Sequence, residues 1–326
     1  AFPVVSRMVS YGMRLPPIRL ASDVSTDIVV AGENSVDVLG VVAAGSDAGA
    51  DKRPLASLRT LAGGQAATAA VGCARLGLRA RYVGVVGDDD RGALVGEALA
   101  HERVDARLTI VPGVPTRAAM ILVDEATGRR TVYERRHPSL RLDTAANAGL
   151  WTDARVLLVD ATDPVASTTA ARLAREAGVR TMVDVDARAP GVDVLLATID
   201  VIVVPETFLC AYTGEAAPGR AIARLGAAFP DALILATLGE RGSLALAQGR
   251  EIRTPAFPVP VVDTTGAGDA FRAGLAAAWL RGGEAANLER ALAVANATAA
   301  LNCRAEGAQQ GLPSWEEVQT LVSAQS

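Results

Sequence analysis

Basic side chains other than arginine are scarce in this chain of 326 residues. Lys52 is the only lysine, and His101 and His137 are the only histidines. Lys52 lies in a polar stretch and does not follow a glycine-rich loop, so the sequence excludes a P-loop and a Schiff-base lysine at any other position. A phosphate-binding site in this chain must therefore rely on other groups.

Cysteine and aromatic residues are also few. The three cysteines, Cys73, Cys210 and Cys303, are far apart and form no CxxC motif. They exclude a thiol-ligated zinc site and a disulfide framework, and we interpret them as small apolar residues in a reducing cytosol. Aromatic residues make up 4% of the chain and show no cluster suited to a purine.

Long apolar runs and positive net charge are absent as well. No window approaches 18 uninterrupted apolar residues, and the formal net charge is −4. We therefore expect a cytoplasmic protein with no membrane and no nucleic acid as partner, acting on a small molecule. Residues 1–24 lack a secretory pattern, and we expect residues 1–26 to form a mobile extension outside the fold, or to reflect a misassigned start.

From residue 27 onward, β-rich apolar runs alternate with helical stretches. Strands are expected at 27–31, 38–42, 81–86, 155–160, 180–185, 200–204 and 232–238, and helices at 66–76, 91–101, 164–177, 267–280 and 288–301. A last amphipathic helix is expected around Trp315. This order is typical of the α/β class, with a doubly wound, mostly parallel sheet in one domain over 27–326.

Two segments break this alternation. Residues 42–60 are polar and contain glycine, while 118–124 and 130–134 alternate in polarity and are joined by a hairpin signal at 125–128. We expect a small β-sheet lid built from about 42–60 and 115–137, near the ligand crevice at the carboxyl ends of the parallel strands. An ordinary edge hairpin is the alternative.

The most informative motif is Gly266-Ala267-Gly268-Asp269, which opens a helix. Backbone N–H groups at a helix N-terminus bind anions, and such donors stabilise the charge that develops in phosphoryl transfer. A carboxylate beside an anion site suits a general base that accepts a proton from an attacking hydroxyl. Alternatively, Asp269 is only a favourable acidic residue near a helix N-terminus, and the glycines only make a turn.

Two further motifs carry polar groups next to predicted strands. Gly63-Gly64 opens another helix, where Gln65 and Thr68 can add polar contacts to a ligand that approaches the glycine backbone. Asp37 follows the first strand and can accept hydrogen bonds from sugar hydroxyls. The alternatives are a strand-to-helix turn and a turn residue.

Together these motifs resemble the PfkB (ribokinase-like) family of carbohydrate kinases. Residues 261–280 look like the C-terminal signature of that family, and 61–77 with 84–89 look like its N-terminal one. The resemblance covers about 29–312. It implies a ribokinase-like fold and transfer of the γ-phosphoryl group of ATP to a sugar hydroxyl, with Mg²⁺ and K⁺ as further cofactors.

The resemblance also implies a role for individual residues. Asp269 would be the catalytic base, and the amides of Gly266, Ala267 and Gly268 the anion hole. The sugar would face Asp37, Gly63, Gly64, Gln65 and Thr68. The nucleotide would contact Thr237, Gly239, Gly242 and Asn296. A monovalent cation would be held by Asp263, Thr265, Asn302, Ala305 and Gly307, largely through backbone oxygens.

The sequence departs from the family pattern at three places. The Asn-x-x-Glu motif that orders Mg²⁺ through water is replaced by Pro205-Glu206-Thr207-Phe208, which leaves Glu206 one position along. Thr68 stands where members commonly carry Asn, and Gly311 lacks the hydroxyl that some members provide to the cation.

Cationic residues of the two lid segments lead to a hypothesis about the substrate. They are Lys52, Arg53, Arg117, Arg135, Arg136 and His137. If two or more converge, with Arg117 and Arg135 foremost, they would bind an anionic group of the substrate; the alternative is surface solvation. Exposed lid strands would favour a homodimer. A nucleoside kinase, or a catalytically weak sugar-sensing protein on the same fold, is the alternative function.

Overall fold

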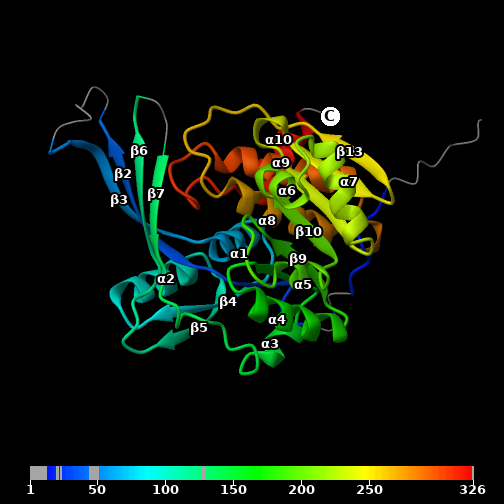
Figure 1. Ribbon diagram of the computed structural model, residues 1–326, viewed down its shortest axis with the longest axis horizontal. Coiled ribbons are helices and arrows are strands. Elements are labelled where there is room, and N and C mark those ends of the chain that lie inside the picture. The colour runs from blue at the N-terminus through cyan, green and yellow to red at the C-terminus, as the bar shows by residue number, and fades with distance from the viewer. Residues whose placement is uncertain (1–12, 20–21, 23, 44–50, 127–129, 325–326) are drawn as a thin grey trace, which may run out of the picture.

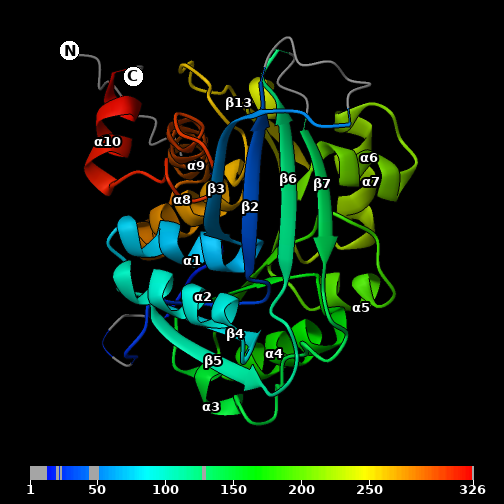
Figure 2. The same cartoon turned by 90° about the vertical axis from the view of Figure 1, so that its left-hand side faces the viewer.

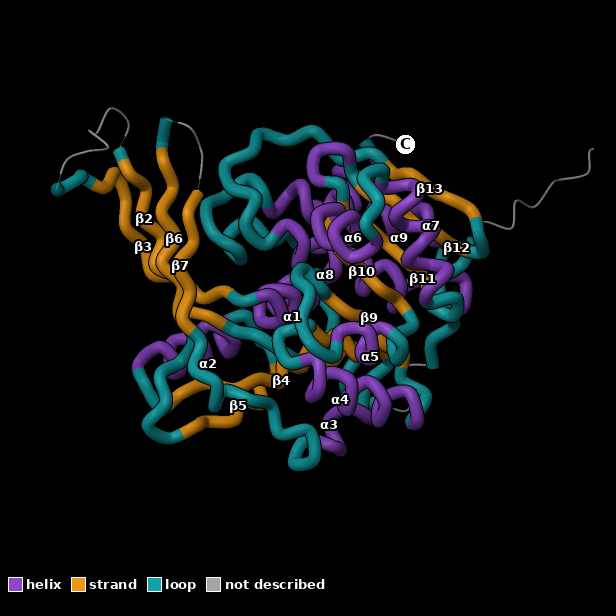
Figure 3. Tube along the Cα trace, in the orientation of Figure 1, coloured by secondary structure: helices purple, strands orange, loops and turns teal. Residues whose placement is uncertain are grey.

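The computed structural model describes residues 13–19, 22, 24–43, 51–126 and 130–324, which form a nine-stranded sheet, a smaller sheet and the covering helices (Figures 1 and 3). The strands of the large sheet are β1 (Ile28–Ala31), β4 (Ala80–Gly87), β5 (Asp105–Val111), β8 (Val156–Asp160), β9 (Arg180–Asp184), β10 (Val201–Pro205), β11 (Leu233–Thr237), β12 (Ser243–Ala247) and β13 (Arg250–Thr254). They lie in the order β13-β12-β11-β10-β9-β8-β1-β4-β5. All neighbours pair in parallel except β11–β12 and β12–β13 at one edge.

Helices cover both faces of this sheet (Figure 1). One face carries α1 (Gln65–Arg75), α2 (Asp90–His101), α8 (Ala267–Gly282), α9 (Leu288–Asn302) and α10 (Trp315–Ser323). The other carries α3 (Ala148–Thr152), α4 (Pro164–Glu176), α5 (Val192–Leu196), α6 (Glu206–Thr213) and α7 (Pro218–Ala228). Short 3-10 helices lie at Gly239–Arg241 and Gly283–Ala285. No helix in the described ranges is long and apolar enough to span a bilayer.

Alternating side chains of the central strands build two hydrophobic cores. In β1, Ile28 and Val30 pack into the cluster under α1, α8 and α9, whereas Val29 and Ala31 pack into the cluster under α4 to α7. A strand that is buried on both faces is apolar throughout, which is why β1 is recognisable in the sequence. The doubly wound, mostly parallel α/β fold predicted from the sequence is confirmed.

The small sheet stands to one side of the large one, and Figure 2 shows it face on. It consists of β2 (Ser35–Val42), β3 (Leu55–Gly63), β6 (Ala118–Asp124) and β7 (Arg130–Arg135), in the order β3-β2-β6-β7. β2 is parallel to β6, while β2–β3 and β6–β7 are antiparallel. The hairpin predicted at 118–134 is thus confirmed as β6–β7, although residues 127–129 of its turn lie outside the described residues.

The structure corrects several boundaries that the sequence predicted. Residues 55–60, expected as part of a polar connection, belong to β3, and residues 44–50 of that connection lie outside the described residues. β2 begins at Ser35 rather than Val38, so Asp37 lies within a strand and not in a turn. β5, β12 and β13 were not expected; every position of β5 and β13 is partly or fully exposed, which hides an apolar pattern, whereas β12 is buried at all but one position.

The N-terminal segment is also corrected, because residues 13–19 pack on the α/β body rather than extend from it. Leu15 and Ile18 are 3% and 4% exposed and join the core under α8 and α9. Trp279 donates a hydrogen bond of 2.7 Å from Nε1 to the carbonyl of Pro16. The expectation of an extension outside the fold therefore fails for this stretch.

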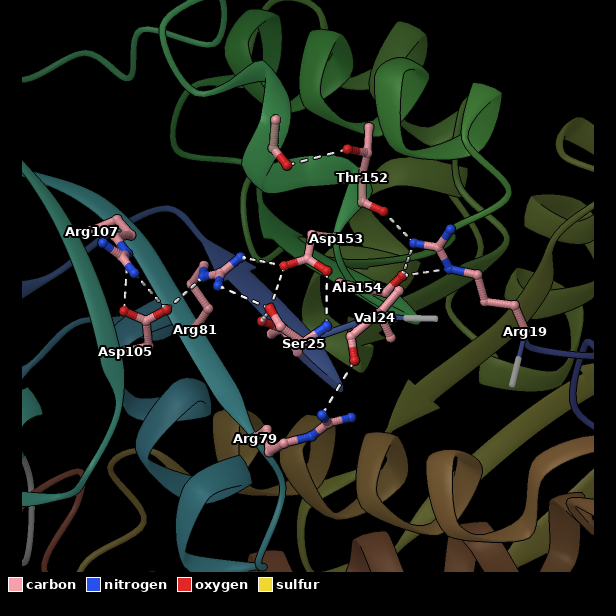
Figure 4. A network of polar contacts seen from close by, with 12 residues as sticks. Arg19, Val24, Ser25, Arg79, Arg81, Asp105, Arg107, Thr152, Asp153 and Ala154 are labelled. Carbon is pink, nitrogen blue, oxygen red and sulfur yellow. Dashed lines mark hydrogen bonds and ion pairs between the residues drawn. The ribbon is translucent and has the colours of Figure 1, made fainter. Parts of the chain in front are cut away.

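Polar contacts tie the same segment to the amino ends of the central strands (Figure 4). Nε of Arg19 donates to the carbonyl of Ala154 at 2.9 Å, just before β8. Arg81 on β4 forms ion pairs with Asp105 on β5 at 2.7 Å and with Asp153 at 3.4 Å. These contacts lie at the amino ends of the strands. The carboxyl ends, where ligands bind in parallel sheets, lie on the opposite side.

Candidate active site

A cleft of about 560 Å³ lies between the carboxyl ends of the large sheet and the inner face of the small sheet. Its lining comes from the ends of β9, β10 and β11, the start of α8, and the facing strands β2, β6 and β7. The side chains or backbones that line it are those of Glu33, Ser35, Asp37, Gly64, Gln65, Arg117, Ala119, Ile121, Val132, Glu134, Thr162, Asp184, Asp186, Pro205, Thr237, Thr264, Thr265, Gly266, Ala267, Gly268, Asp269, Arg272 and Ala308.

The N-terminus of α8 enters the cleft through a turn that requires glycine. Gly266 has a φ of +75°, and a Cβ at this position would lie 2.4 Å from the carbonyl oxygen of Ala308. A residue with a side chain would be strained there and would also collide with the backbone. Through this turn Gly266, Ala267 and Gly268 line the cleft, and the Ala267 N–H donates to the carbonyl of Thr264 at 3.2 Å.

Asp269 lies in the first turn of α8 and is 9% exposed. Its Oδ1 lies 3.9 Å from Nη1 of Arg272, which in turn forms an ion pair with Asp184 at the end of β9. Burial, and then the negative charge of Asp184, raise the pKa of Asp269 well above its usual value. A carboxyl group in this setting is a strong proton acceptor once it is ionised.

Asp37 faces the cleft from the small sheet. Ser35 donates a hydrogen bond of 2.7 Å to Oδ1 of Asp37, and burial raises the pKa of the Asp37 carboxyl. A Cβ at Gly63, the partner of Ser35 across β2–β3, would lie 2.3 Å from Oδ2 of Asp37, so glycine leaves room for the carboxylate. Asp37 can therefore accept hydrogen bonds from hydroxyl groups of a ligand.

The start of α1 lies between these two sides. Gly64 has a φ of +92°, and a Cβ there would lie 2.4 Å from Cα of Asn34. Gln65 lines the cleft and donates a hydrogen bond of 2.5 Å from Nε2 to Oδ2 of Asp186. The structure thus brings together the predicted residues Asp37, Gly64, Gln65 and Asp269.

Two predicted contacts are corrected because their side chains are buried elsewhere. Thr68 is fully buried in α1, and its Oγ1 lies 3.4 Å from Nε2 of Gln309, so it does not face the cleft. Asn296 on α9 is 5% exposed and donates from Nδ2 to Oγ of Ser243 and to two backbone carbonyls. This amide holds β12 to α9 and does not line the cleft.

The predicted nucleotide loop follows β11. Thr237 lines the cleft, whereas Gly239 and Gly242 lie beyond it in the turn between β11 and β12. Glu206, expected to order Mg²⁺, forms an ion pair with Arg241 in the same turn and does not line the cleft. A role of the two glycines in nucleotide binding stays a prediction.

The residues predicted to hold a monovalent cation gather beside the N-terminus of α8. Asp263 accepts hydrogen bonds from the amide of Thr265 at 2.9 Å and from the amide of Gly307 at 2.8 Å. Asn302 donates from Nδ2 to the carbonyl of Thr265 at 3.0 Å, and its buried Oδ1 has no hydrogen-bond partner among the described residues. Ala305 lies in the bend between Asn302 and Gly307.

Two cationic residues of the lid segments, Arg117 and Arg136, line one small cavity of about 40 Å³ together with Glu33 and Asp160, and the other cationic residues do not join them there. Arg117 lines the cleft, but Arg135 is exposed outside it, as are Lys52 and Arg53. The guanidinium of Arg117 is paired with Glu33 at 2.7 Å and with Glu134 at 2.6 Å. Arg136 turns instead toward the carbonyls of Thr162 and Leu140.

Sequence reasoning missed five charged residues of the cleft: Glu33, Glu134, Asp184, Asp186 and Arg272. Asp184 is the last residue of β9, and Glu33 lies in the loop just after β1, which ends at Ala31. Burial raises the pKa of each of these two carboxyls to about 7. Their position after buried parallel strands is the signal that would have identified them.

A parallel sheet with helices on both faces, together with a cleft that holds a helix N-terminus and a buried carboxylate, suits an α/β phosphotransferase. The model of the pfkB family of carbohydrate kinases matches residues 25–315. The chain therefore belongs to this family, and it is a phosphotransferase with an alcohol group as acceptor. The resemblance noted in the sequence is confirmed.

Three relatives illustrate the likeness. The chain is 34% identical to a fructokinase of Klebsiella pneumoniae (79% of this chain, 90% of the relative) and 31% identical to a ribokinase of Bacillus subtilis (84% and 94%). A structure of Arabidopsis thaliana ribokinase complexed with ribose and ATP is 26% identical and superposes with a TM-score of 0.76, covering 91% of this chain and 98% of that one.

Proposed function

We propose that the protein transfers the γ-phosphoryl group of MgATP to a hydroxyl group of a small neutral sugar, with Asp269 as the general base. The observation that carries the proposal is one cleft in which Asp269 and the N-terminus of α8 lie opposite Asp37 and Gly64. The ribose and ATP bound by the Arabidopsis ribokinase support the two substrates.

Each part of the cleft would have one task. Asp37 and the backbone at Gly63 and Gly64 orient the sugar, and Asp269 accepts the proton of the attacking hydroxyl. The amides at Gly266 to Gly268 stabilise the negative charge on the phosphoryl group as it moves. The small sheet acts as a lid that keeps water from the phosphoryl group.

The charge of the cleft favours a sugar without an anionic group. Its acidic lining residues are Glu33, Asp37, Glu134, Asp184, Asp186 and Asp269, and its cationic ones are Arg117 and Arg272. Both arginines are already in ion pairs. We therefore replace the hypothesis of an anionic substrate by one of a neutral polyol. Among the residues that the structure describes, no aromatic side chain lines the cleft, which favours a sugar over a nucleoside.

The fit of the two metal ions differs. Asp263, Thr265, Asn302, Ala305 and Gly307 suit K⁺, because the buried Oδ1 of Asn302 lacks a partner among the described residues and backbone oxygens of the bend lie nearby. When bound, K⁺ adds positive charge beside the anion hole. Glu206 does not fit a magnesium site in this arrangement, because its carboxylate is paired with Arg241. Mg²⁺ therefore enters with ATP as part of the substrate.

The deciding experiment measures sugar-dependent ADP release with Mg²⁺ and K⁺ across a panel that includes ribose and fructose. Asp269→Asn keeps the shape of the side chain and is expected to lower kcat by about 10²–10⁴-fold. Equal inactivity of wild type and variant on every sugar, together with a rise in Tm on adding one of them, would instead establish a sugar-sensing protein.

A further inference from the structure

Arg272 places a buried positive charge beside the proposed general base. It lies on α8 three residues after Asp269, is 4% exposed, and lines the same cleft. Its Nη2 forms an ion pair with Oδ1 of Asp184, and its Nη1 lies 3.9 Å from Oδ1 of Asp269. One guanidinium therefore connects a carboxylate at the end of β9 with the carboxylate on α8.

The surrounding backbone holds this guanidinium in place. Nη2 of Arg272 donates to the carbonyl of Val203 on β10 at 3.4 Å. A Cβ at Gly268 would lie 2.8 Å from Nη1 of Arg272, so the glycine next to Asp269 also makes room for the arginine. The position of Arg272 is thus set by β9, β10 and the turn that opens α8.

Charged groups face Asp269 from several elements. Arg272 faces it from α8 and Asp184 from β9; Asp186, which follows β9 and is bonded to Gln65 of α1, adds a second negative charge. Asp160, the partner of Asp184 across β8–β9, carries a further negative charge that raises the pKa of Asp184. Negative charges and burial therefore favour the protonated form of Asp269, and Arg272 favours the ionised form.

We propose that Arg272 and Asp184 are positioning residues that set the protonation of Asp269 in opposite directions: Arg272 favours the ionised carboxylate, and Asp184 raises the affinity of that carboxylate for a proton. The proposal rests on the proposed function. A base must be ionised to accept a proton, and it accepts the proton best when its own affinity for it is high. The positive charge of Arg272 favours ionisation of Asp269. The negative charge of Asp184 raises the proton affinity of Asp269, and Asp184 also holds Arg272 through their ion pair.

The reaction step transfers one phosphoryl group to the sugar and one proton to Asp269. The sugar hydroxyl oxygen forms a bond to the γ-phosphorus, and the bond between that phosphorus and the β–γ bridging oxygen breaks, leaving its electron pair on ADP. The hydroxyl proton goes to a carboxylate oxygen of Asp269, whose negative charge it neutralises. Arg272 and Asp184 exchange no atoms with the substrate.

The test compares pH profiles of kcat/KM, whose acid limb reports the ionisation of the free enzyme. Arg272→Gln removes the positive charge, so the acid limb should move to higher pH by about one unit or more. Asp184→Asn removes the negative charge and should move the acid limb to lower pH. Arg272→Lys keeps the charge and should restore the limb close to that of wild type.

Matched controls carry the same substitutions at exposed sites, Arg290→Gln and Asp231→Asn, and should leave the limb in place. A purely structural role would lower activity at every pH without moving the limb, and that result would overturn the proposal. A rise in KM for MgATP at every pH in Arg272→Gln, with the limb unmoved, would overturn it as well, because Arg272 would then bind phosphate directly.

A second measurement needs no activity. Burial raises the pKa of Asp184 from its ordinary value of 3.8 to about 7. Between these two pH values the folded chain therefore keeps a proton that the unfolded chain has lost, so stability falls as pH rises through this window. Between pH 5 and 8, Tm should fall less in Asp184→Asn than in wild type, and more in Arg272→Gln. Equal slopes in all three would overturn the inference. Lack of ADP release by wild type would overturn only the proposed function.

Discussion

Nε of Arg117 lies 2.7 Å from Oε1 of Glu33, and this ion pair joins the loop after β1 to the base of the small sheet. The side chains are 14% and 11% exposed, so the pair is largely shielded from solvent. On its other side, Nη2 of Arg117 lies 2.6 Å from Oε2 of Glu134 on β7. A negatively charged substrate would have to compete with both carboxylates for the one guanidinium.

Removal of the Glu134 charge should therefore weaken discrimination against anionic sugars. In Glu134→Gln we expect the ratio of kcat/KM for an aldonate, whose primary hydroxyl is free, to that for a neutral sugar to rise several-fold, about the effect of one partly exposed charge. Steady-state kinetics on both substrates give the ratio. Glu97→Gln, an exposed site on α2, is the control, and an unchanged ratio in Glu134→Gln would contradict the shielding role.

Gly266→Ala should impair both folding and catalysis. The left-handed backbone strains any side chain, and the new Cβ would lie 2.4 Å from the carbonyl oxygen of Ala308, so we expect a loss of about 1–3 kcal/mol in the free energy of unfolding. kcat should fall because the first amides of α8 move. Gly214→Ala is matched in φ, at +73°, but has nothing within 4 Å of the new Cβ. Chemical denaturation gives the free energy of unfolding, and steady-state kinetics give kcat. Equal losses of both quantities in the two variants would refute the steric argument.

The sequence predicted six of the nine strands of the large sheet, β1, β4 and β8 to β11, because these strands are largely buried. β1 and β10 are uniformly apolar, and β8 is apolar up to its last residue, Asp160; such runs between helical stretches are visible without any structure. β3 was missed because its residues are mostly exposed and its pairing with β2 supplies the stability. An edge strand of this kind carries little apolar pattern of its own.

The site was predicted in part for a related reason. Gly266 to Asp269 form a local motif whose chemistry depends on neighbours in sequence, and they line the cleft. The roles of Arg272 and Asp184 depend on contact between α8 and β9, which no local pattern shows. Thr68 was misplaced because a helix that starts at a ligand also carries residues into the core one turn later.

Asn302→Ala should reduce activation by K⁺. Wild-type activity is expected to rise when K⁺ replaces a large organic cation, because Asn302 offers a buried Oδ1 without a partner among the described residues. The variant loses this oxygen and the hydrogen bond of 3.0 Å to Thr265. Initial rates over a K⁺ titration measure the effect. Asn147→Ala, in the loop before α3, is the control; equal K⁺ activation in wild type and Asn302→Ala would contradict the assignment.

Ile18→Ala tests whether the N-terminal segment belongs to the fold. Because Ile18 is 4% exposed and packs into the main core, truncation should lower the free energy of unfolding by about 2–4 kcal/mol. Val165→Ala, at a position 63% exposed on α4, should change it by less than about 0.5 kcal/mol. Urea denaturation of both variants decides, and equal stabilities would refute the packing of residues 13–19.

The outer face of the small sheet should form a dimer interface. Ala119, Ile121, Val132 and Glu134 line the cleft, so the alternate residues Met120 and Tyr133 point away from it. Met120 and Tyr133 are direct partners across β6–β7 and are 50% and 62% exposed, and Leu58 on β3 is 64% exposed. An exposed apolar sheet face of this kind favours a second copy of the chain.

Tyr133→Glu places a charge in the middle of that face and should convert a dimer into a monomer. Light scattering after size-exclusion chromatography at micromolar concentration measures the mass of each species. Val165→Glu adds the same charge on α4, away from the small sheet, and should leave the dimer intact. A monomeric wild type, or a Tyr133→Glu variant that remains a dimer, would show that this face does not pair two chains, because a glutamate cannot be buried there without a large loss of binding free energy.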